Sequence, residues 1–322
     1  PSEHWRQLGP MTALLALVLL ALVLVPGMGR EVNGSVRWLR LGGFSLQVAE
    51  PARLLMLIYV AGYATRHADD LQQRAWGFFK PMLVVGAAAG LLLLQPDFGS
   101  AVVLTTICLA VLFVAGARLL WFFGVSLLVG GLAIVAALAS PYRLARITGF
   151  MDPWSDPYGS GFQLTQSLIA IGSGELTGVG LGSSMQKLFY LPEAHTDFVF
   201  AVLAEEFGLL GSLALVALFA ALIWRALLVA KQAALLQRMF QAYLCFGFAV
   251  WLGAQVFINI GVNMGILLTK GLTLPLVSYG RSSLIITLIA LGLLLRIDYE
   301  NRKPAPRKRR KATGRGRKGA RA

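Results

Sequence analysis

Long apolar runs, separated by short polar breaks, recur along nearly the whole chain. A helix needs about 20 apolar residues to cross a bilayer. The alternation of period two that marks membrane strands is absent, which leaves helices as the spanning elements. The pattern therefore predicts an all-α, polytopic membrane helical bundle. Eight spans are expected, at Leu8–Val25, Val48–Thr65, Phe78–Leu94, Phe98–Ala115, Leu119–Ala139, Asp197–Ile223, Gln241–Met264 and Ser282–Leu295.

Basic residues predict how these spans are oriented, because connections rich in Lys and Arg face the cytoplasm. Such residues gather in alternate connections and after the last span, which predicts a cytoplasmic C-terminus. The remaining connections are then expected to face outward. They are Met28–Gln47, the break at Gln95–Asp97, the long extracytoplasmic loop Ser140–Thr196, and Gly265–Arg281.

Composition agrees with a membrane protein, since 57% of residues are hydrophobic, 14% are charged, and mean hydropathy is +0.70. The formal charge of +14 arises mainly from Arg302–Ala322, which holds eleven Lys or Arg and no acid. We therefore expect a membrane domain over residues 1–300 and a basic, disordered, cytoplasmic tail over residues 301–322. Beside a last span, such a tail favours anionic lipid as its contact over nucleic acid.

The outward connections carry basic residues that topology does not explain, and a phosphate ligand would explain them. The long loop also contains the periodic stretch Phe162–Ile171, which predicts a short helix along the outer membrane surface. Cys108 and Cys245 lie inside apolar runs, so neither a disulfide framework nor metal-ligand spacing is visible. The unexplained cations are Arg30, Arg37, Arg40, Arg143, Arg146 and Lys187.

Asp197, with His195 just before it, opens an apolar segment in which small residues recur on the face of the acid. Ionisable groups near lipid are costly and usually face a cavity or a partner. An Asp before an apolar run is also a common helix cap. The local pattern leaves capping and chemistry evenly balanced. The small residues are Ala201, Ala204, Gly208 and Gly211.

Three further groups of polar residues stand out. Glu50 and Arg53 share one helix face. They are interpreted either as a buried ion pair that holds helices together or as the polar lining of an outward cavity. Gln255, Asn259 and Asn263 form a polar stripe, for which hydrogen bonding between helices is an adequate explanation. Glu205 and Glu206 are the strongest argument for transport. A re-entrant loop is expected within Gly265–Ser283, which contains Lys270, Ser278 and Ser282.

Four stretches together resemble the SEDS family of bacterial shape and division proteins, from Trp5 to about Glu300. Ala194 and the form of the loop that begins at Lys270 resemble the division member of that family more than the rod-shape member. The family has ten spans with both ends cytoplasmic, so the eight seen here imply that the first two are missing. The stretches are Gln95–Gly99 (QPDFG), Leu191–Phe200 (LPEAHTDFVF), Ala204–Gly208 (AEEFG) and Lys270–Tyr279 (KGLTLPLVSY).

The resemblance implies a peptidoglycan glycosyltransferase that polymerises lipid II outside the cytoplasmic membrane, at the division septum. Partners implied are a class B penicillin-binding protein and other divisome membrane proteins, and no nucleic acid. It makes Asp197 the essential acid, which we interpret as the base of an inverting transfer with undecaprenyl pyrophosphate as leaving group. A divalent cation, Mg²⁺ or Mn²⁺, is an optional cofactor. Further candidates for the outward cavity are Glu50, Arg53, Lys270, Arg143, His195, Ser278 and Ser282.

The chain departs from the family pattern at three positions. Arg53 stands where the family usually has Lys, Val48 where it has Pro, and Arg281 where it has Gly. The last places a bulky cation in a glycine-rich turn. Two rival functions remain open at this point: a transporter that flips lipid II, and a scaffold without catalytic activity that activates a partner polymerase.

Overall fold

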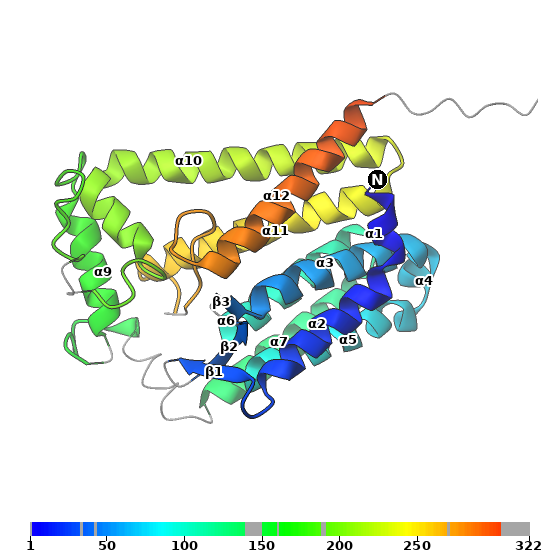
Figure 1. Ribbon diagram of the computed structural model, residues 1–322, viewed down its shortest axis with the longest axis horizontal. Helices are drawn as coiled ribbons and strands as arrows, with labels where there is room; N and C mark the ends of the chain where they lie inside the picture. Colours follow the sequence, from blue (N-terminus) through cyan, green and yellow to red (C-terminus); the bar gives the residue numbers. More distant parts are fainter. Residues whose placement is uncertain are drawn as a thin grey trace, which may run out of the picture.

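The computed structural model describes residues 2–32, 35–41, 44–138, 150–159, 161–187, 191–268 and 271–303. Figure 1 shows two groups of long helices that run along the molecule, with α10, α11 and α12 in one group and α2, α3 and α5–α7 in the other. The helices are α1 (Glu3–Gln7), α2 (Gly9–Val23), α3 (Ala49–Arg66), α4 (Ala68–Gln73), α5 (Ala75–Leu94), α6 (Phe98–Val114), α7 (Leu119–Leu138), α9 (Phe162–Ser173), α10 (Val199–Leu235), α11 (Met239–Asn263) and α12 (Arg281–Arg302).

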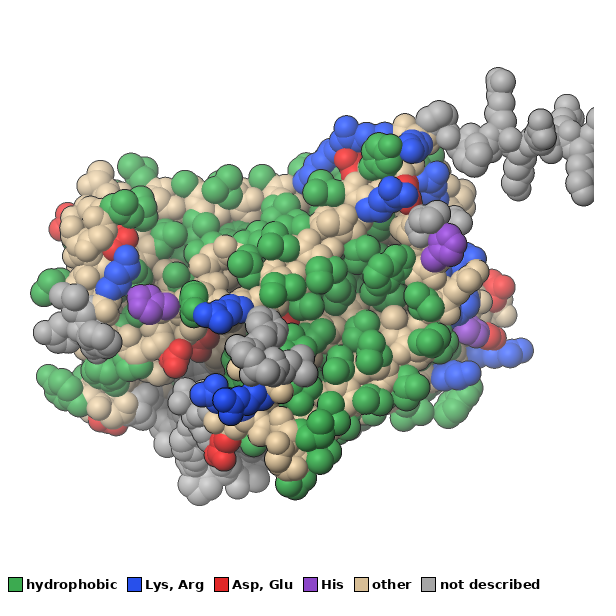
Figure 2. Space-filling view, viewed as in Figure 1, with side chains coloured by type: hydrophobic (Ala, Val, Ile, Leu, Met, Phe, Trp, Pro, Cys, Tyr) green, Lys and Arg blue, Asp and Glu red, His purple; other side chains and the backbone are tan. Residues whose placement is uncertain are grey.

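Each of the eight expected spans coincides with a helix, and α9 coincides with the periodic stretch of the long loop. The helical membrane fold is therefore confirmed. Among the described helices α5, α10, α11 and α12 are long and apolar enough to cross a membrane, whereas α2 and α6 are shorter apolar helices. The number of spans stays a prediction. In Figure 2 apolar side chains cover much of the visible face, while charged side chains gather at the right-hand end and are scattered over the left half.

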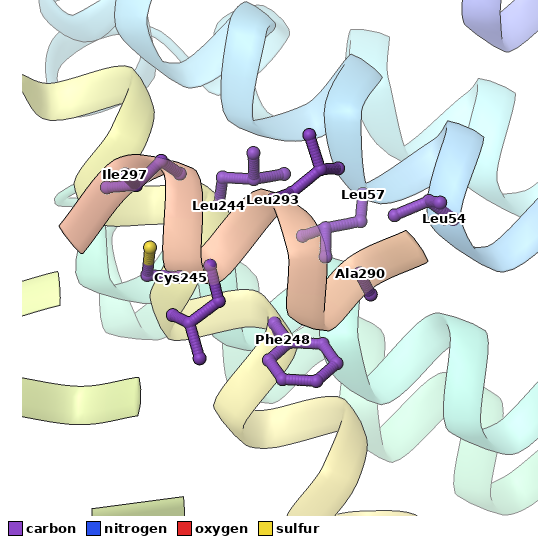
Figure 3. A pocket seen from close by; sticks show the side chains of 9 residues that line it. Leu54, Leu57, Leu244, Cys245, Phe248, Ala290, Leu293 and Ile297 are labelled. Atoms are coloured by element: carbon purple, nitrogen blue, oxygen red, sulfur yellow. The ribbon is translucent and has the colours of Figure 1, made fainter. Parts of the chain in front are cut away.

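Helix α3 lies at the centre of the core, where it packs against α2, α6 and α11. Gly247 of α11 allows this close approach, because a Cβ there would lie 2.2 Å from Leu57 Cδ1 of α3. On its other side α3 meets α12. Figure 3 shows the seam between α3, α11 and α12, where an apolar void of about 10 Å³ remains beside Ala290 and Phe248. A void of this size without polar partners does not hold water.

A small antiparallel sheet forms in the connection between α2 and α3, in the order β1 (Gly29–Val32), β2 (Ser35–Leu41) and β3 (Phe44–Gln47). The sequence did not indicate these strands, because strands this short give no sustained period of two. Ser282 joins the sheet to α12: its Oγ accepts a hydrogen bond from Gln47 N (3.1 Å) and donates one to Ser45 O (3.2 Å).

Helix α10 is broken near its start at Gly208, where φ is +64°. Glycine is required there, since a Cβ would also lie 2.4 Å from Gly178 N. The segment Glu175–Gly180 lies in the break and pairs with the backbone groups that it frees. Val179 N donates to Glu205 O (3.0 Å), Gly180 N to Glu206 O (3.2 Å), Leu209 N to Glu175 O (2.9 Å) and Leu210 N to Leu176 O (3.2 Å).

The side chains of Glu205 and Glu206 hold the same loop. Glu205 accepts hydrogen bonds from Ser184 Oγ (2.5 Å) and Met185 N (3.0 Å). Glu206 accepts from Lys187 Nζ (2.5 Å) and Gly182 N (3.1 Å), and both carboxylates are almost fully buried. Buried carboxylates that are saturated by loop donors do a structural task. The argument for a transport path that rested on this pair therefore loses its support.

Candidate active site

Asp197 does not cap α10. That helix begins at Val199 without any side-chain cap, and Asp197 N instead donates to Glu193 O (3.2 Å) in a preceding turn. The carboxylate of Asp197 is half-buried, and no described residue forms a hydrogen bond with it. The backbone of Asp197 is held in place while its carboxylate has no described hydrogen-bond partner. This arrangement is consistent with a role in catalysis rather than in helix capping.

The polar stripe of α11 holds the backbone of Asp197. Asn259 Nδ2 and Asn263 Nδ2 each donate to Asp197 O at 2.9 Å. Asn263 Oδ1 accepts from Ala201 N (3.1 Å) in the first turn of α10, so one side chain fixes both the acid and its helix. The expected hydrogen bonding between helices is confirmed. Its purpose is more specific than joining helices, because the carbonyl of the candidate catalytic acid is the shared acceptor.

The loop before α12 covers the other side of this turn. Tyr279 N donates to His195 O (2.8 Å), and Ser278 Oγ donates to Thr196 O (2.5 Å). At the start of the same loop Gly271 lies so close that a Cβ there would be 2.8 Å from Asp197 Oδ2. The peptide that carries Asp197 is thus clamped between α11 and the loop at residues 271–280.

Electrostatics prepare Asp197 to take up a proton. The pKa of Asp197 is raised to about 6, mainly by burial and also by the nearby carboxylates of Glu193 and Asp97, while the guanidinium of Arg37 opposes the rise. With a pKa of about 6 the group is ionised at neutral pH and still binds a proton more readily than an ordinary Asp. A general base works best when its pKa lies near the working pH.

Two residues of this environment, Arg37 and Asp97, were not assigned to the cavity from sequence, although Arg37 was noted as an outward cation and Asp97 lies in the QPDFG stretch. Arg37 of β2 donates to Gln95 O (3.3 Å) and Pro96 O (2.5 Å), which anchors it at the break between α5 and α6. Asp97 caps α6 by accepting from Ser100 N (3.1 Å), while its buried Oδ2 has no partner among the described residues. The unexplained outward cation and the QPDFG stretch were the available signals.

Glu50 and Arg53 form the expected ion pair at 3.2 Å, and their side chains are 3% and 0% exposed. Arg53 also donates to Gln255 Oε1 (3.3 Å) and stacks 5.2 Å from the ring centroid of Trp251, both on α11. Arg53 Nε and Nη2 are buried without a partner in the described chain. The pairing is confirmed, and burial shows that it joins α3 to α11. A role in the substrate cavity stays a prediction.

The other candidates fall in different places. His195 and Ser278 line a cavity of about 740 Å³ between α10 and α12, and Ser282 is buried at the junction with the sheet. Arg143 and Lys270 lie outside the described residues. Within the described ranges no three His, Cys, Asp or Glu side chains are placed to hold a metal ion. The expected divalent cation therefore stays a prediction, and no step below depends on it.

The fold and this site define a class: a helical, multi-pass membrane protein with an acid whose backbone is held by two amides and whose carboxylate has no hydrogen-bond partner among the described residues. A family model described as "Cell cycle protein", for FtsW, RodA and SpoVE, matches residues 1–303. The chain belongs to this FtsW/RodA/SpoVE family, and the resemblance drawn from the sequence is confirmed.

Curated relatives match most of the chain. It is 54% identical to the "Probable peptidoglycan glycosyltransferase FtsW" of Coxiella burnetii, covering 93% of this chain and 81% of the relative. It is 56% identical to the protein of that name from Alkalilimnicola ehrlichii, covering 95% and 77%. The predicted enzyme class therefore agrees with the names of relatives that share more than half of its residues.

Solved structures have the same fold. A chain from a peptidoglycan synthase complex that coordinates polymerization and crosslinking superposes with a TM-score of 0.75 at 33% identity, covering 94% of this chain and 84% of that one. The rod shape determining protein RodA of Thermus thermophilus superposes with a TM-score of 0.66 at 34% identity, covering 94% and 81%.

Proposed function

We propose that this chain is a peptidoglycan glycosyltransferase that polymerises lipid II into glycan strands, with Asp197 as the general base. The observation that carries this role is the state of Asp197: two amides hold its backbone, and its carboxylate has a pKa of about 6 and no hydrogen-bond partner among the described residues. The names of the relatives support the reaction, and the site supports the choice of residue.

The step forms one bond and breaks one. The hydroxyl oxygen of the acceptor sugar attacks the anomeric carbon of the donor, and the bond from that carbon to the diphosphate oxygen breaks. The hydroxyl proton passes to Asp197, and the lipid diphosphate leaves with the bonding electron pair. The α-linked donor becomes a β-linked product, because attack and departure occur on opposite faces. Arg37, which opposes the rise in the pKa of Asp197, is placed to balance negative charge that develops nearby.

The family also suggests where the chain works and with what. One structural neighbour belongs to a complex that couples polymerization to crosslinking. We infer that this chain also works with a crosslinking partner, a class B penicillin-binding protein, as expected from the sequence. We place the chain in the bacterial cytoplasmic membrane at the division septum, with the site of Asp197 outside and the C-terminus inside.

Replacing Asp197 by Asn tests the assignment, since the amide matches the carboxylate in volume and cannot accept the proton. Polymer made from lipid II by the purified Asp197→Asn protein should fall by about 10²- to 10⁴-fold. Asp70→Asn is a matched control, because it makes the same change at an exposed carboxylate of α4 that does not contribute to the pKa of Asp197. A variant Asp197→Asn that makes polymer at the wild-type rate would falsify the role of the base.

A further inference from the structure

The cavity of about 740 Å³ lies beside the catalytic turn, but Asp197 is not among the residues that line it. Its walls come from Lys187, from the turn at His195, from the start of α10 and from the loop and first turn of α12. Sites for small molecules enclose about 300–1,000 Å³. The volume is therefore sufficient for the part of a lipid around its head group, at a place separate from the carboxylate.

One side of this groove is apolar. The residues that α10 contributes recur at intervals of three and four, so they form a single stripe on one helix face. Leu284 of α12 stands opposite, and Leu284 and Phe207 are 40% and 44% exposed. Walls that remain this exposed belong to an open groove on a helical membrane protein, where lipid chains have access. The apolar residues of the α10 stripe are Val199, Val202, Leu203 and Phe207.

The other side of the groove is cationic. Arg281 lies one helical turn before Leu284 on α12, and its Nη2 donates to Tyr279 Oη (3.2 Å). No described carboxylate pairs with Arg281. Glu206 also lines the groove, but it is already occupied by Lys187 Nζ and Gly182 N. Lys187 and Glu206 neutralise each other, so Arg281 is the cation of the described lining whose charge is not balanced, and it favours an anionic head group.

The cationic end is joined directly to the catalytic turn. Ser278 and Tyr279 line the groove, and they hydrogen-bond to the carbonyls of Thr196 and His195. The short peptide that carries Asp197 therefore also forms part of the wall of the groove.

We propose that this groove is a seat for an isoprenoid lipid diphosphate, with the diphosphate between Arg281 and Lys187 and the prenyl chain along the apolar stripe of α10. This inference rests on the proposed function, whose leaving group is such a lipid. A diphosphate suits the site better than the single phosphodiester of a common phospholipid, because its additional oxygens can accept from Arg281 and from a second N–H of the Lys187 ammonium group, which also binds Glu206. His195 supplies a further hydrogen-bonding group at this end.

Photocrosslinking tests the seat without needing turnover. The wild-type protein in nanodiscs is labelled with farnesyl diphosphate that carries a diazirine, and the labelled peptides are mapped by mass spectrometry. Labels should concentrate on residues 199–207 and 281–288 and should be displaced by undecaprenyl diphosphate. Inorganic diphosphate or phosphatidylglycerol at equal concentration should displace them weakly. The proposal would be overturned by labels elsewhere in the chain or by equal displacement with phosphatidylglycerol. It would also be overturned if only the membrane helix of a partner protein prevented the labelling.

Two variants and one control sharpen the test. Arg281→Gly removes the cation and should weaken labelling by about tenfold, the value of one charged hydrogen bond. Leu284→Trp should weaken it by filling the groove while Arg281 is retained. Arg225→Gln, which removes an arginine paired with Asp298 at 3.2 Å on the opposite end of α12, should leave labelling unchanged. Wild-type labelling in both groove variants would contradict the seat.

The Asp197→Asn protein separates this proposal from the proposed function. It should lose polymer synthesis and keep labelling, because Asp197 does not line the groove. If wild-type protein makes polymer but shows no label in the groove, the seat is wrong and the reaction stands. If the groove is labelled but no polymer forms, the proposed reaction is wrong.

Discussion

The ion pair of Glu50 and Arg53 and the turn that carries Asp197 both bind the polar stripe of α11, yet they are held in opposite ways. Glu50 and Arg53 are held through their charged atoms, which contact each other and α11. Asp197 is held through its backbone carbonyl, and its carboxylate is left free of described partners. Fixing a charge by its own atoms gives stability. Fixing the backbone beneath it leaves the charge available for a reaction.

The largest expected effect lies in the ion pair. Glu50→Gln should lower the free energy of unfolding by about 3–5 kcal/mol, because it leaves a buried guanidinium without its carboxylate. Arg53→Gln should do the same. The double variant should be less destabilised than the sum of the two, as thermal unfolding in detergent can measure. Independent effects would show that the pair is not coupled and would break the contrast with Asp197.

The second largest effect is expected at Asn259 and Asn263, whose side-chain amides bind the backbone carbonyl of Asp197. Asn263→Ala should slow polymerisation by roughly 10- to 100-fold, because a small shift of a catalytic group has a large effect on rate. Asn259→Ala should act in the same direction and by less, since Asn263 also binds α10. If the two amides act by positioning the backbone of Asp197, kcat should fall while KM for lipid II changes little. A rise in KM with kcat unchanged would instead assign the amides to substrate binding.

The smallest effect is expected at Gly271. Alanine there puts a methyl group 2.8 Å from Asp197 Oδ2, so the carboxylate must move, and activity should fall by about three- to tenfold. Gly280→Ala is the matched control in the same loop. Its Cβ would meet Ser283 Cβ and Thr273 Cγ2 at 3.5 Å, an ordinary contact. Equal losses in the two variants, compared in one polymerisation assay, would count against crowding of the carboxylate.

Sequence reasoning located the helices well, because apolar runs of this length have few other structures available. It also paired Glu50 with Arg53 and recognised that the stripe on α11 makes hydrogen bonds between helices. It could not choose between capping and chemistry for Asp197, since that choice depends on where the first turn of α10 begins. The structure excludes capping, because α10 begins at Val199 without a side-chain cap, and chemistry at Asp197 stays a prediction.

The parts that sequence missed depend on contacts between distant segments. The sheet of β1–β3 is too short to show a period, and Arg37 reaches the site only because that sheet brings it to the break at Gln95 and Pro96. From the sequence alone, Glu205 and Glu206 are interpreted as acids at membrane depth. Their partners lie about 20 residues earlier in the loop that enters the break at Gly208, which no local pattern indicates.

The rate of glycan synthesis as a function of pH tests the central claim most directly. A free base with a pKa of about 6 predicts a rate that is nearly constant above neutral pH and falls as the pH drops through 6. At one pH unit below the pKa the rate should be about a tenth of its plateau, because a tenth of the carboxylate remains ionised. Asn263→Ala should lower the plateau. A wild-type rate that stays constant from neutral pH down to pH 4.5, with the protein still folded, would contradict Asp197 as the base.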